Sequence, residues 1–255
     1  MKKIAVLTAL LFAALQIGYA QKVGLVLSGG GAKGAAHIGV IKALEENGIP
    51  IDYITGTSAG AIVGSLYAMG YTPEEMVELM LSEEFSYWQT GTVENEYKYY
   101  FKRPDPTPEF GHFSIDMTDS LQVKASFLPQ SLINPIQMNQ AFMALFSQAT
   151  AKAGWNFDNL FVPFRCVASD IYSKKAIIFK NGDLGDAVRA SMTFPFFFQP
   201  IWKDSVPIFD GGIYDNFPVG PMKEAFHPDF IFGSTVAGGN NKPSSNPCLL
   251  YTSPS

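Results

Sequence analysis

VGLVLSGGGAKG, residues 23–34, is the stretch that decides the fold. Its first five residues form an uncharged apolar run, and residues 29–34 follow as a glycine-rich loop. A short continuous apolar run is typical of a parallel strand buried on both faces. After the loop, apolar residues recur at helical spacing over residues 35–47, and Gly48 is a natural helix-ending residue. The stretch therefore predicts a strand, a tight turn and a helix.

The same order of elements then repeats. Residues 52–55 predict a second strand, residues 56–60 a turn, and residues 61–69 a helix that ends before Gly70. A further helix is expected from residue 72, where TPEE is a capping box with proline at the first helical position. This alternation of strands and helices predicts the α/β class with a parallel sheet.

The rest of the chain is less regular. Residues 85–113 combine many aromatic residues with three prolines, and we expect an irregular excursion over the sheet. Helices are predicted at 137–152 and 183–192, and strands at 162–168, 176–179 and 230–236. Because no repeat or linker is visible, residues 21–239 are predicted to form one domain. Residues 240–255 are predicted to be a tail, whose ending CLLYTSPS indicates a chain cut short after about Asn246; a short natural terminus is the alternative.

Composition narrows the function classes. The 255 residues are 47% hydrophobic and 16% charged, which suits a globular core. The formal net charge is −5, without a basic cluster, so nucleic acid is not an expected partner. Cys166 and Cys248 match no zinc pattern and are too few for a disulfide framework.

The first twenty residues have the pattern of an export signal. A basic start (MKK) precedes an apolar run without charge, and GYA at 18–20 offers a cleavage site after Ala20. The run is short for a membrane span of about 20 residues, so we expect cleavage rather than anchoring. The mature protein would then work outside the cytoplasm: in the periplasm, at the outer membrane or secreted.

A serine stands in a glycine-flanked turn. Residues 56–60, GTSAG, match G-x-S-x-G between a predicted strand and helix, with Gly56, Ser58 and Gly60 at the motif positions. Such a turn presents a nucleophilic hydroxyl at a helix N-terminus, where developing negative charge is favoured. The alternative is that Ser58 is an ordinary helix cap.

The glycine loop also admits two functions. Gly29, Gly31 and Gly34 fit the dinucleotide fingerprint G-x-G-x-x-G, which needs an acidic residue near the end of the second strand. That strand instead runs into Thr55, and Asp52 stands at its start. The other possibility is an oxyanion hole, in which successive glycine amides converge on one point. Lys33 could add positive charge there or be a solvated loop lysine.

A nucleophilic serine needs a base. Asp210 follows an apolar run and precedes Gly211 and Gly212, so it is either the base or part of a hairpin turn. His227 would complete a Ser58–Asp210–His227 triad in hydrolase order, although the following proline indicates an exposed connection. His37 is placed to brace the glycine loop.

Taken together, the three motifs resemble the patatin-like phospholipases, in particular bacterial secreted members. The resemblance runs from Lys22 to about Gly239 and includes LSGGGAKGAAHIGVIKAL, ITGTSAGAIVGSLYAMG and VRASMTFPFFFQPI ahead of DGGIYDNFPV. It implies a three-layer α/β/α fold with a mainly parallel central sheet. It also implies a phospholipase A-type hydrolase that needs no metal or other cofactor.

The resemblance assigns roles to the motif residues. Ser58 would be the nucleophile and Asp210 its partner in a dyad without histidine. Gly30 and Gly31, with neighbouring amides of the loop, would hold the oxyanion. The expected substrate is a phospholipid or another acyl-ester lipid. The aromatic residues around FPFFF (194–198) would line an acyl groove, touch a membrane surface or pack in the core.

Overall fold

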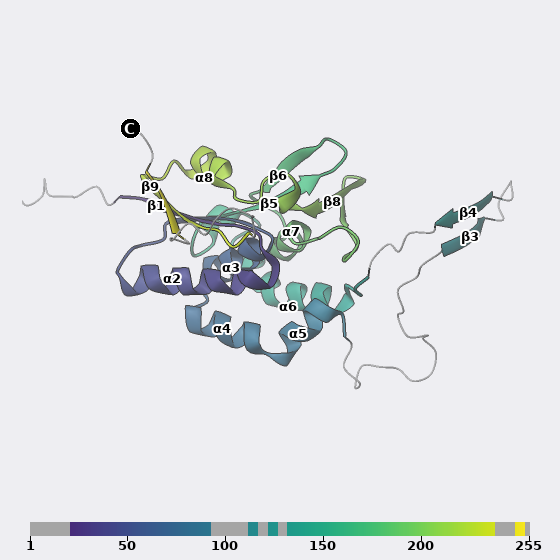
Figure 1. The fold of residues 1–255 in the computed structure, drawn as a ribbon, viewed down its shortest axis with the longest axis horizontal. Helices are drawn as coiled ribbons and strands as arrows, with labels where there is room; N and C mark the ends of the chain where they lie inside the picture. The colour runs from purple at the N-terminus through teal and green to yellow at the C-terminus, as the bar shows by residue number, and fades with distance from the viewer. Residues whose placement is uncertain (1–20, 93–111, 117–121, 127–131, 238–247, 253–255) are drawn as a thin grey trace, which may run out of the picture.

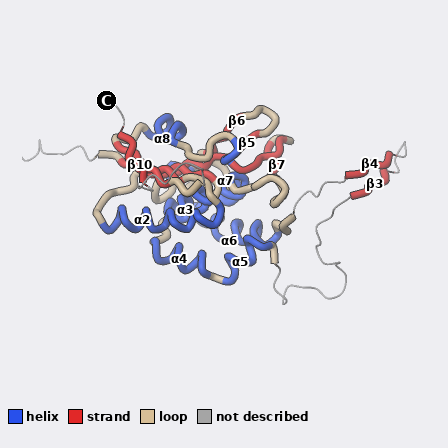
Figure 2. Tube along the Cα trace, viewed as in Figure 1, coloured by secondary structure: helices blue, strands red, loops and turns tan. Residues whose placement is uncertain are grey.

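The computed structural model describes residues 21–92, 112–116, 122–126, 132–237 and 248–252. One large sheet lies at its centre (Figures 1 and 2). The strands of this sheet run in the order β10-β9-β1-β2-β5-β8-β7, and β6 pairs with β5 outside that path. Their bounds are β1 Val23–Leu27, β2 Tyr53–Thr57, β5 Phe164–Asp170, β6 Lys175–Phe179, β7 Ile201–Lys203, β8 Val206–Asp210, β9 Phe230–Ser234 and β10 Cys248–Thr252.

The sheet is mixed, and only its centre is parallel. Strands β9, β1, β2 and β5 run parallel, whereas β6, β7, β8 and β10 pair antiparallel with their neighbours. The expected parallel sheet therefore holds for the four central strands. A separate two-stranded sheet joins β3 His112–Asp116 to β4 Gln122–Ser126.

Helices cover both faces of the parallel strands, which gives the α/β/α layering. Figure 1 shows α8 (Val219–Phe226) on one face and α2 (Ala36–Glu46) and α3 (Ala59–Ala68) on the other. The side chains of β1 alternate accordingly, because Leu25 and Leu27 belong to the core beneath α2 and α3 and Val26 packs with Met222 of α8. The remaining helices are α4 Pro73–Leu81, α5 Glu83–Thr90, α6 Ile136–Lys152 and α7 Leu184–Ser191.

One prediction about the middle of the chain was wrong, and some elements were not predicted. Residues 83–90 form α5 rather than an irregular excursion, because Ser82 accepts a capping hydrogen bond from the Phe85 amide and Gly91 ends the helix in a left-handed conformation. The short helix α8 was not predicted. Within the predicted tail, residues 248–252 form β10 and extend the sheet beside β9. The predicted export signal lies outside the described residues.

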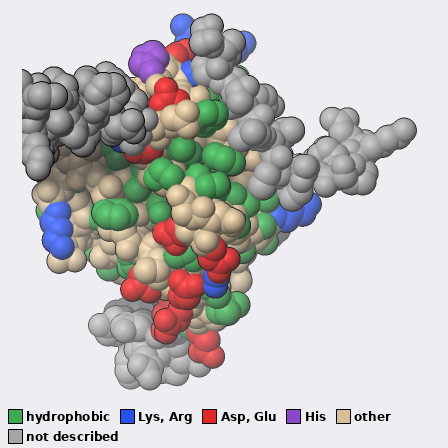
Figure 3. All heavy atoms as spheres, turned by 90° about the vertical axis from the view of Figure 1, so that its left-hand side faces the viewer, with side chains coloured by type: hydrophobic (Ala, Val, Ile, Leu, Met, Phe, Trp, Pro, Cys, Tyr) green, Lys and Arg blue, Asp and Glu red, His purple; other side chains and the backbone are tan. Residues whose placement is uncertain are grey.

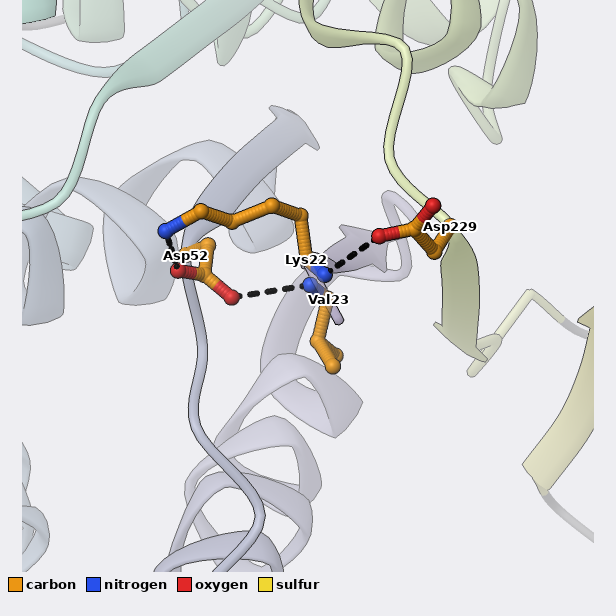
Figure 4. A network of polar contacts seen from close by, with 4 residues as sticks. All are labelled: Lys22, Val23, Asp52 and Asp229. Atoms are coloured by element: carbon orange, nitrogen blue, oxygen red, sulfur yellow. Dashed lines mark hydrogen bonds and ion pairs between the residues drawn. The ribbon is translucent and has the colours of Figure 1, made fainter. Parts of the chain in front are cut away.

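The amino ends of the central strands are tied together by a polar network. The backbone amide of Lys22 donates to Asp229 at 2.7 Å, and the Lys22 ammonium donates to Asp52 at 2.7 Å. Asp52 also accepts from the Val23 amide at 2.9 Å, as Figure 4 shows. These residues precede β9, β1 and β2, so the network fixes the register of three strands at the edge where they begin.

Acidic side chains gather in the lower part of the face shown in Figure 3, which is the left-hand side of Figure 1. Helix α4 alone carries Glu74, Glu75 and Glu78. Within the described residues, no helix combines the length and apolar character needed to cross a membrane.

Candidate active site

Ser58 occupies a strained turn between β2 and α3. Its φ of 54° and ψ of −119° lie in a region that non-glycine residues rarely adopt. A Cβ on Gly56 would collide with the Gly60 carbonyl, and a Cβ on Gly60 would collide with the Leu27 carbonyl. The two motif glycines are therefore required by space, which lets the sharp turn present Ser58 at the N-terminus of α3.

The Ser58 hydroxyl contacts a carboxylate rather than capping the helix. Its Oγ donates to Oδ2 of Asp210 at 2.6 Å, and it makes no capping hydrogen bond to α3. The other carboxylate oxygen, Oδ1, accepts the Gly212 amide at 2.7 Å. Asp210 is thus held through Oδ1 by its own turn, and Oδ2 faces the serine.

The register of β5 explains how residues so distant in sequence meet. Because β6 occupies one edge of β5, β2 and β8 must share the other edge. On that edge Thr57 pairs with Val167 and Asp210 pairs with Ala168, which are consecutive residues. The end of β8 therefore faces the end of β2, one residue before the nucleophile turn.

Burial controls the acidity of Asp210. The residue is 7% exposed, and desolvation raises the pKa of its carboxyl group above the ordinary value. Hydrogen bonds from Ser58 and the Gly212 amide oppose that shift because they favour the charged form. The carboxylate is consequently more basic than an exposed aspartate, which suits a group that accepts a proton from serine.

The glycine loop lies beside Ser58. The Gly29 amide donates to the Asn216 carbonyl at 3.1 Å and is already used. The amides of Gly30 and Gly31 have no acceptor among the residues that the structure describes, and both residues line the same cavity as Ser58. Gly31 needs glycine for conformation, with φ of +59°. These two amides can therefore donate to a developing oxyanion.

The remaining loop residues have structural positions. A Cβ on Gly34 would collide with Ala59, so this glycine allows the loop to pack against α3. Lys33 is exposed and is not among the residues that line the cavity. Similarly, Gly211 is required by space, because a Cβ there would collide with the Val167 carbonyl.

Neither His37 nor His227 contacts Ser58. His37 is fully buried, with Nε2 2.9 Å from the Ser28 carbonyl and Nδ1 2.7 Å from the Ser234 hydroxyl. A carbonyl only accepts, so Nε2 carries the proton, and desolvation lowers the pKa of His37. His227 ends α8 three residues before β9 begins, at the amino edge of the sheet, opposite the carboxyl edge that holds Ser58.

Dinucleotide binding has no support at the second strand. β2 ends in Gly56 and Thr57, without an acidic residue where a ribose would be held. Asp52 lies at the opposite edge and is engaged by Lys22 and Val23 (Figure 4).

An apolar cavity of about 950 Å³ opens onto the serine. Ser58, Asp210 and the glycine loop form its polar end. The other walls are apolar side chains of α4, α5, α6 and residues 192–198; they include Met80, Phe85, Trp88, Met138, Phe142, Met192, Phe194, Phe197 and Phe198. The arrangement can therefore hold a long hydrocarbon group with its polar end at Ser58.

Sequence reasoning missed two residues that hold this site together. Ser191, at the end of α7, accepts the Ser58 amide at 2.9 Å. Asn216 accepts the Gly29 amide through its carbonyl, and its side chain lies against Gly212. A small polar residue at the end of a predicted helix was a weak signal for Ser191, and Asn216 stands close to the Asp210 motif.

Known proteins resemble this chain. A family model described as patatin-like phospholipase matches residues 25–223. Lysophospholipase NTE1 of Pyricularia oryzae is 31% identical over 217 residues, and the patatin-like phospholipase domain-containing protein ZK370.4 of Caenorhabditis elegans is 29% identical over 203. The alignments cover 85% and 79% of this chain, which spans only 12% of either relative.

Solved structures give weaker likenesses. VipD from Legionella pneumophila superposes with a TM-score of 0.47 and 17% identity, over 78% of this chain and 47% of that one. ExoU in its complex with SpcU from Pseudomonas aeruginosa gives a TM-score of 0.35 and 19% identity, over 71% of this chain and 38% of that one.

Proposed function

The chain belongs to the patatin-like phospholipase family, a family of lipid ester hydrolases, and from this premise we propose that Ser58 and Asp210 act as a catalytic dyad. The observation that carries the proposal is the 2.6 Å hydrogen bond from Ser58 Oγ to Asp210 Oδ2. Family membership and the absent acidic residue on β2 disfavour a dinucleotide-dependent oxidoreductase. The place of His227 at the opposite edge disfavours a triad.

The reaction would proceed through an acyl-enzyme. Asp210 takes the proton of Ser58 as Oγ attacks the ester carbonyl carbon. The tetrahedral oxyanion accepts hydrogen bonds from the amides of Gly30 and Gly31 near the N-terminus of α3. The intermediate collapses, the C–O bond breaks, and the leaving alcohol takes the proton from Asp210. Water, deprotonated by Asp210, then attacks the acyl-serine; the bond between the acyl carbon and Ser58 Oγ breaks, Oγ takes the proton back from Asp210, and the fatty acid is released.

Three variants test the dyad. Ser58→Ala and Asp210→Asn should each abolish hydrolysis of a soluble p-nitrophenyl ester, and His227→Ala should leave it unchanged. A fluorophosphonate probe should label the wild type and fail to label Ser58→Ala. A folded His227→Ala protein without activity would overturn the dyad in favour of a triad, and labelling that persists in Ser58→Ala would move the nucleophile elsewhere.

We propose a phospholipid or lysophospholipid as the substrate. The cavity volume lies near the upper end of the range for ligand pockets, about 300–1,000 Å³, and most of its walls are apolar. Release of fatty acid should therefore depend on chain length, with long-chain esters preferred over butyryl esters. A panel of lipids that differ in head group and chain length measures this, and equal rates for all chain lengths would contradict a role for the cavity.

Membrane contact would come from the aromatic residues at the cavity mouth. Phe194 and Phe197 line the cavity and are also exposed, and Phe196 is 62% exposed with φ of +68°. Backbone hydrogen bonds from Leu132 and Ile133 to the Phe196 and Phe197 carbonyls hold the loop in this shape. An acidic protein has no electrostatic attraction to anionic lipid. Binding of Ser58→Ala should thus be no stronger to anionic vesicles than to zwitterionic ones, and it should fall when Phe196→Ala is added.

We further propose that the protein is exported, as in bacterial secreted members of the family. The support is the basic start, apolar run and small-residue site in residues 1–20. Expression of the whole sequence in a bacterium should give a periplasmic or secreted form whose mass corresponds to a start at Gln21. A cytoplasmic product that retains residue 1 would contradict export.

A further inference from the structure

Ser191 links the nucleophile to the central sheet. It is the last residue of α7 and is fully buried. Its hydroxyl donates to the Val167 carbonyl of β5 at 2.5 Å and accepts the Ser58 amide at 2.9 Å. A single oxygen therefore connects β5 to the backbone of the residue that would attack the substrate.

The Ser58 amide needs this partner because of where it stands. Pairing between β2 and β5 ends at Thr57 and Val167, and the chain then turns sharply into α3. At its φ of 54° the serine is outside both the strand and the helix, so neither element supplies an acceptor for its amide. A hydroxyl that donates to a carbonyl is also polarised into a better acceptor.

The same stretch of β5 also positions Asp210. Val167 pairs with Thr57, and its neighbour Ala168 pairs with Asp210. By fixing the Ser58 amide to the Val167 carbonyl, Ser191 fixes the distance between the two dyad members. A Ser–Asp dyad has no imidazole ring between its two residues whose movement could compensate for a change in that distance.

We propose that Ser191 is a positioning residue for the nucleophile: it holds the strained Ser58 backbone so that Oγ faces Asp210. The inference rests on the proposed dyad. It requires a residue that both donates and accepts at this place, which serine and threonine hydroxyls do and alanine does not.

The test compares Ser191→Ala with a matched control. Ser169→Ala removes the same atom from another fully buried serine, on β5 itself, whose Oγ has no hydrogen-bond partner within the described residues. With a soluble p-nitrophenyl ester, Ser191→Ala should lower kcat by about 10- to 100-fold, as expected for a displaced reacting group, with little change in KM. Fluorophosphonate labelling should slow in parallel, and Ser169→Ala should match the wild type.

Rescue separates positioning from packing. Ser191→Thr keeps the hydroxyl and should retain most of kcat, whereas Ser191→Cys, a weaker donor and acceptor, should fall between Thr and Ala. If Ser191→Ala does not fold, the Thr-to-Cys ratio carries the test. The proposal is overturned if kcat stays within about threefold of wild type, if the loss lies in KM, or if Ser169→Ala loses as much. Activity that survives Ser58→Ala would instead overturn the dyad itself.

Discussion

Asp210→Asn is the substitution that most directly tests the chemistry of the site. The amide has the shape of the carboxylate, and its oxygen can still accept the Gly212 amide that now lies 2.7 Å from Oδ1. The NH₂ group would then face Ser58 Oγ, where Oδ2 accepts a proton at 2.6 Å in the wild type. The variant therefore keeps the geometry and loses only the base.

The expected loss of activity in Asp210→Asn follows from the role of Asp210 as a general base. A positioned general base contributes about 10²- to 10⁴-fold to rate, or about 2.7–5.4 kcal/mol of activation free energy at 1.36 kcal/mol per tenfold. We expect kcat/KM of Asp210→Asn for a soluble p-nitrophenyl ester to fall by at least about 10²-fold. Retention of more than about a tenth of wild-type activity would refute the role of Asp210 as base.

The stability of the same variant gives an independent reading. Burial raises the pKa of Asp210, so the ionised form is less favourable in the folded protein than in the unfolded chain. Protonated Asp210 therefore stabilises the folded protein. This stabilisation is complete below the pKa of aspartate in the unfolded chain, about 3.9, and is lost as pH rises through the higher pKa of Asp210 in the folded protein. At neutral pH, Asp210→Asn should therefore melt at or above the wild-type temperature, as measured by circular dichroism.

A pH profile completes this prediction. Because the dyad needs ionised Asp210, kcat/KM should fall as pH decreases through its raised folded pKa, on the alkaline side of an ordinary aspartate. The same profile should be obtained with His227→Ala. An acid limb that shifts in that variant would implicate the histidine.

Three further substitutions follow from the described contacts. Gly56→Ala would place a methyl against the Gly60 carbonyl, and fluorophosphonate labelling should be lost; normal labelling would contradict the need for glycine. His37→Phe leaves the Ser28 carbonyl without its buried donor, so urea denaturation should show a loss of about 1–3 kcal/mol, and an unchanged midpoint would argue against the brace. Asp52→Asn weakens a partly exposed ion pair at the far edge of the sheet, so stability should fall by less than about 1 kcal/mol with kcat/KM unchanged.

Local signals predicted most elements near the beginning of the chain. The strand at 23–27 was placed correctly, and the helix expected at 35–47 is α2, Ala36–Glu46. The capping box at Thr72 is present with both reciprocal hydrogen bonds. Here spacing and capping act within a few residues, so sequence alone suffices. Helix α5 was not predicted because its many aromatic residues indicated an irregular segment despite the capping residue Ser82. Helix α8 was not predicted because it is short.

The candidate site was predictable as a set of motifs but not as an arrangement. The spacing of the glycines allowed GTSAG and the glycine loop to be recognised as tight turns, although the contacts that require Gly34 and Gly60 come from residues distant in the chain. By contrast, the residues alone did not decide whether Ser58 is a nucleophile or a helix cap. They also did not decide whether Asp210 is a base or part of a hairpin turn. Those alternatives differ only in where one side chain points.

The sequence by itself determined the alternation of strands and helices, the two glycine turns and the family resemblance, because these depend on residues close together in the chain. Tertiary structure decided that Ser58 Oγ meets a carboxylate 152 positions away and that His227 lies at the opposite edge of the sheet. It also decided that an apolar cavity lies between the Ser58–Asp210 pair and α6. The physical reason is the pairing of two strands along one edge of β5, which brings Thr57 and Asp210 to consecutive residues. Strand pairing of this kind joins residues far apart in the chain, so the spacing of neighbouring residues does not reveal it.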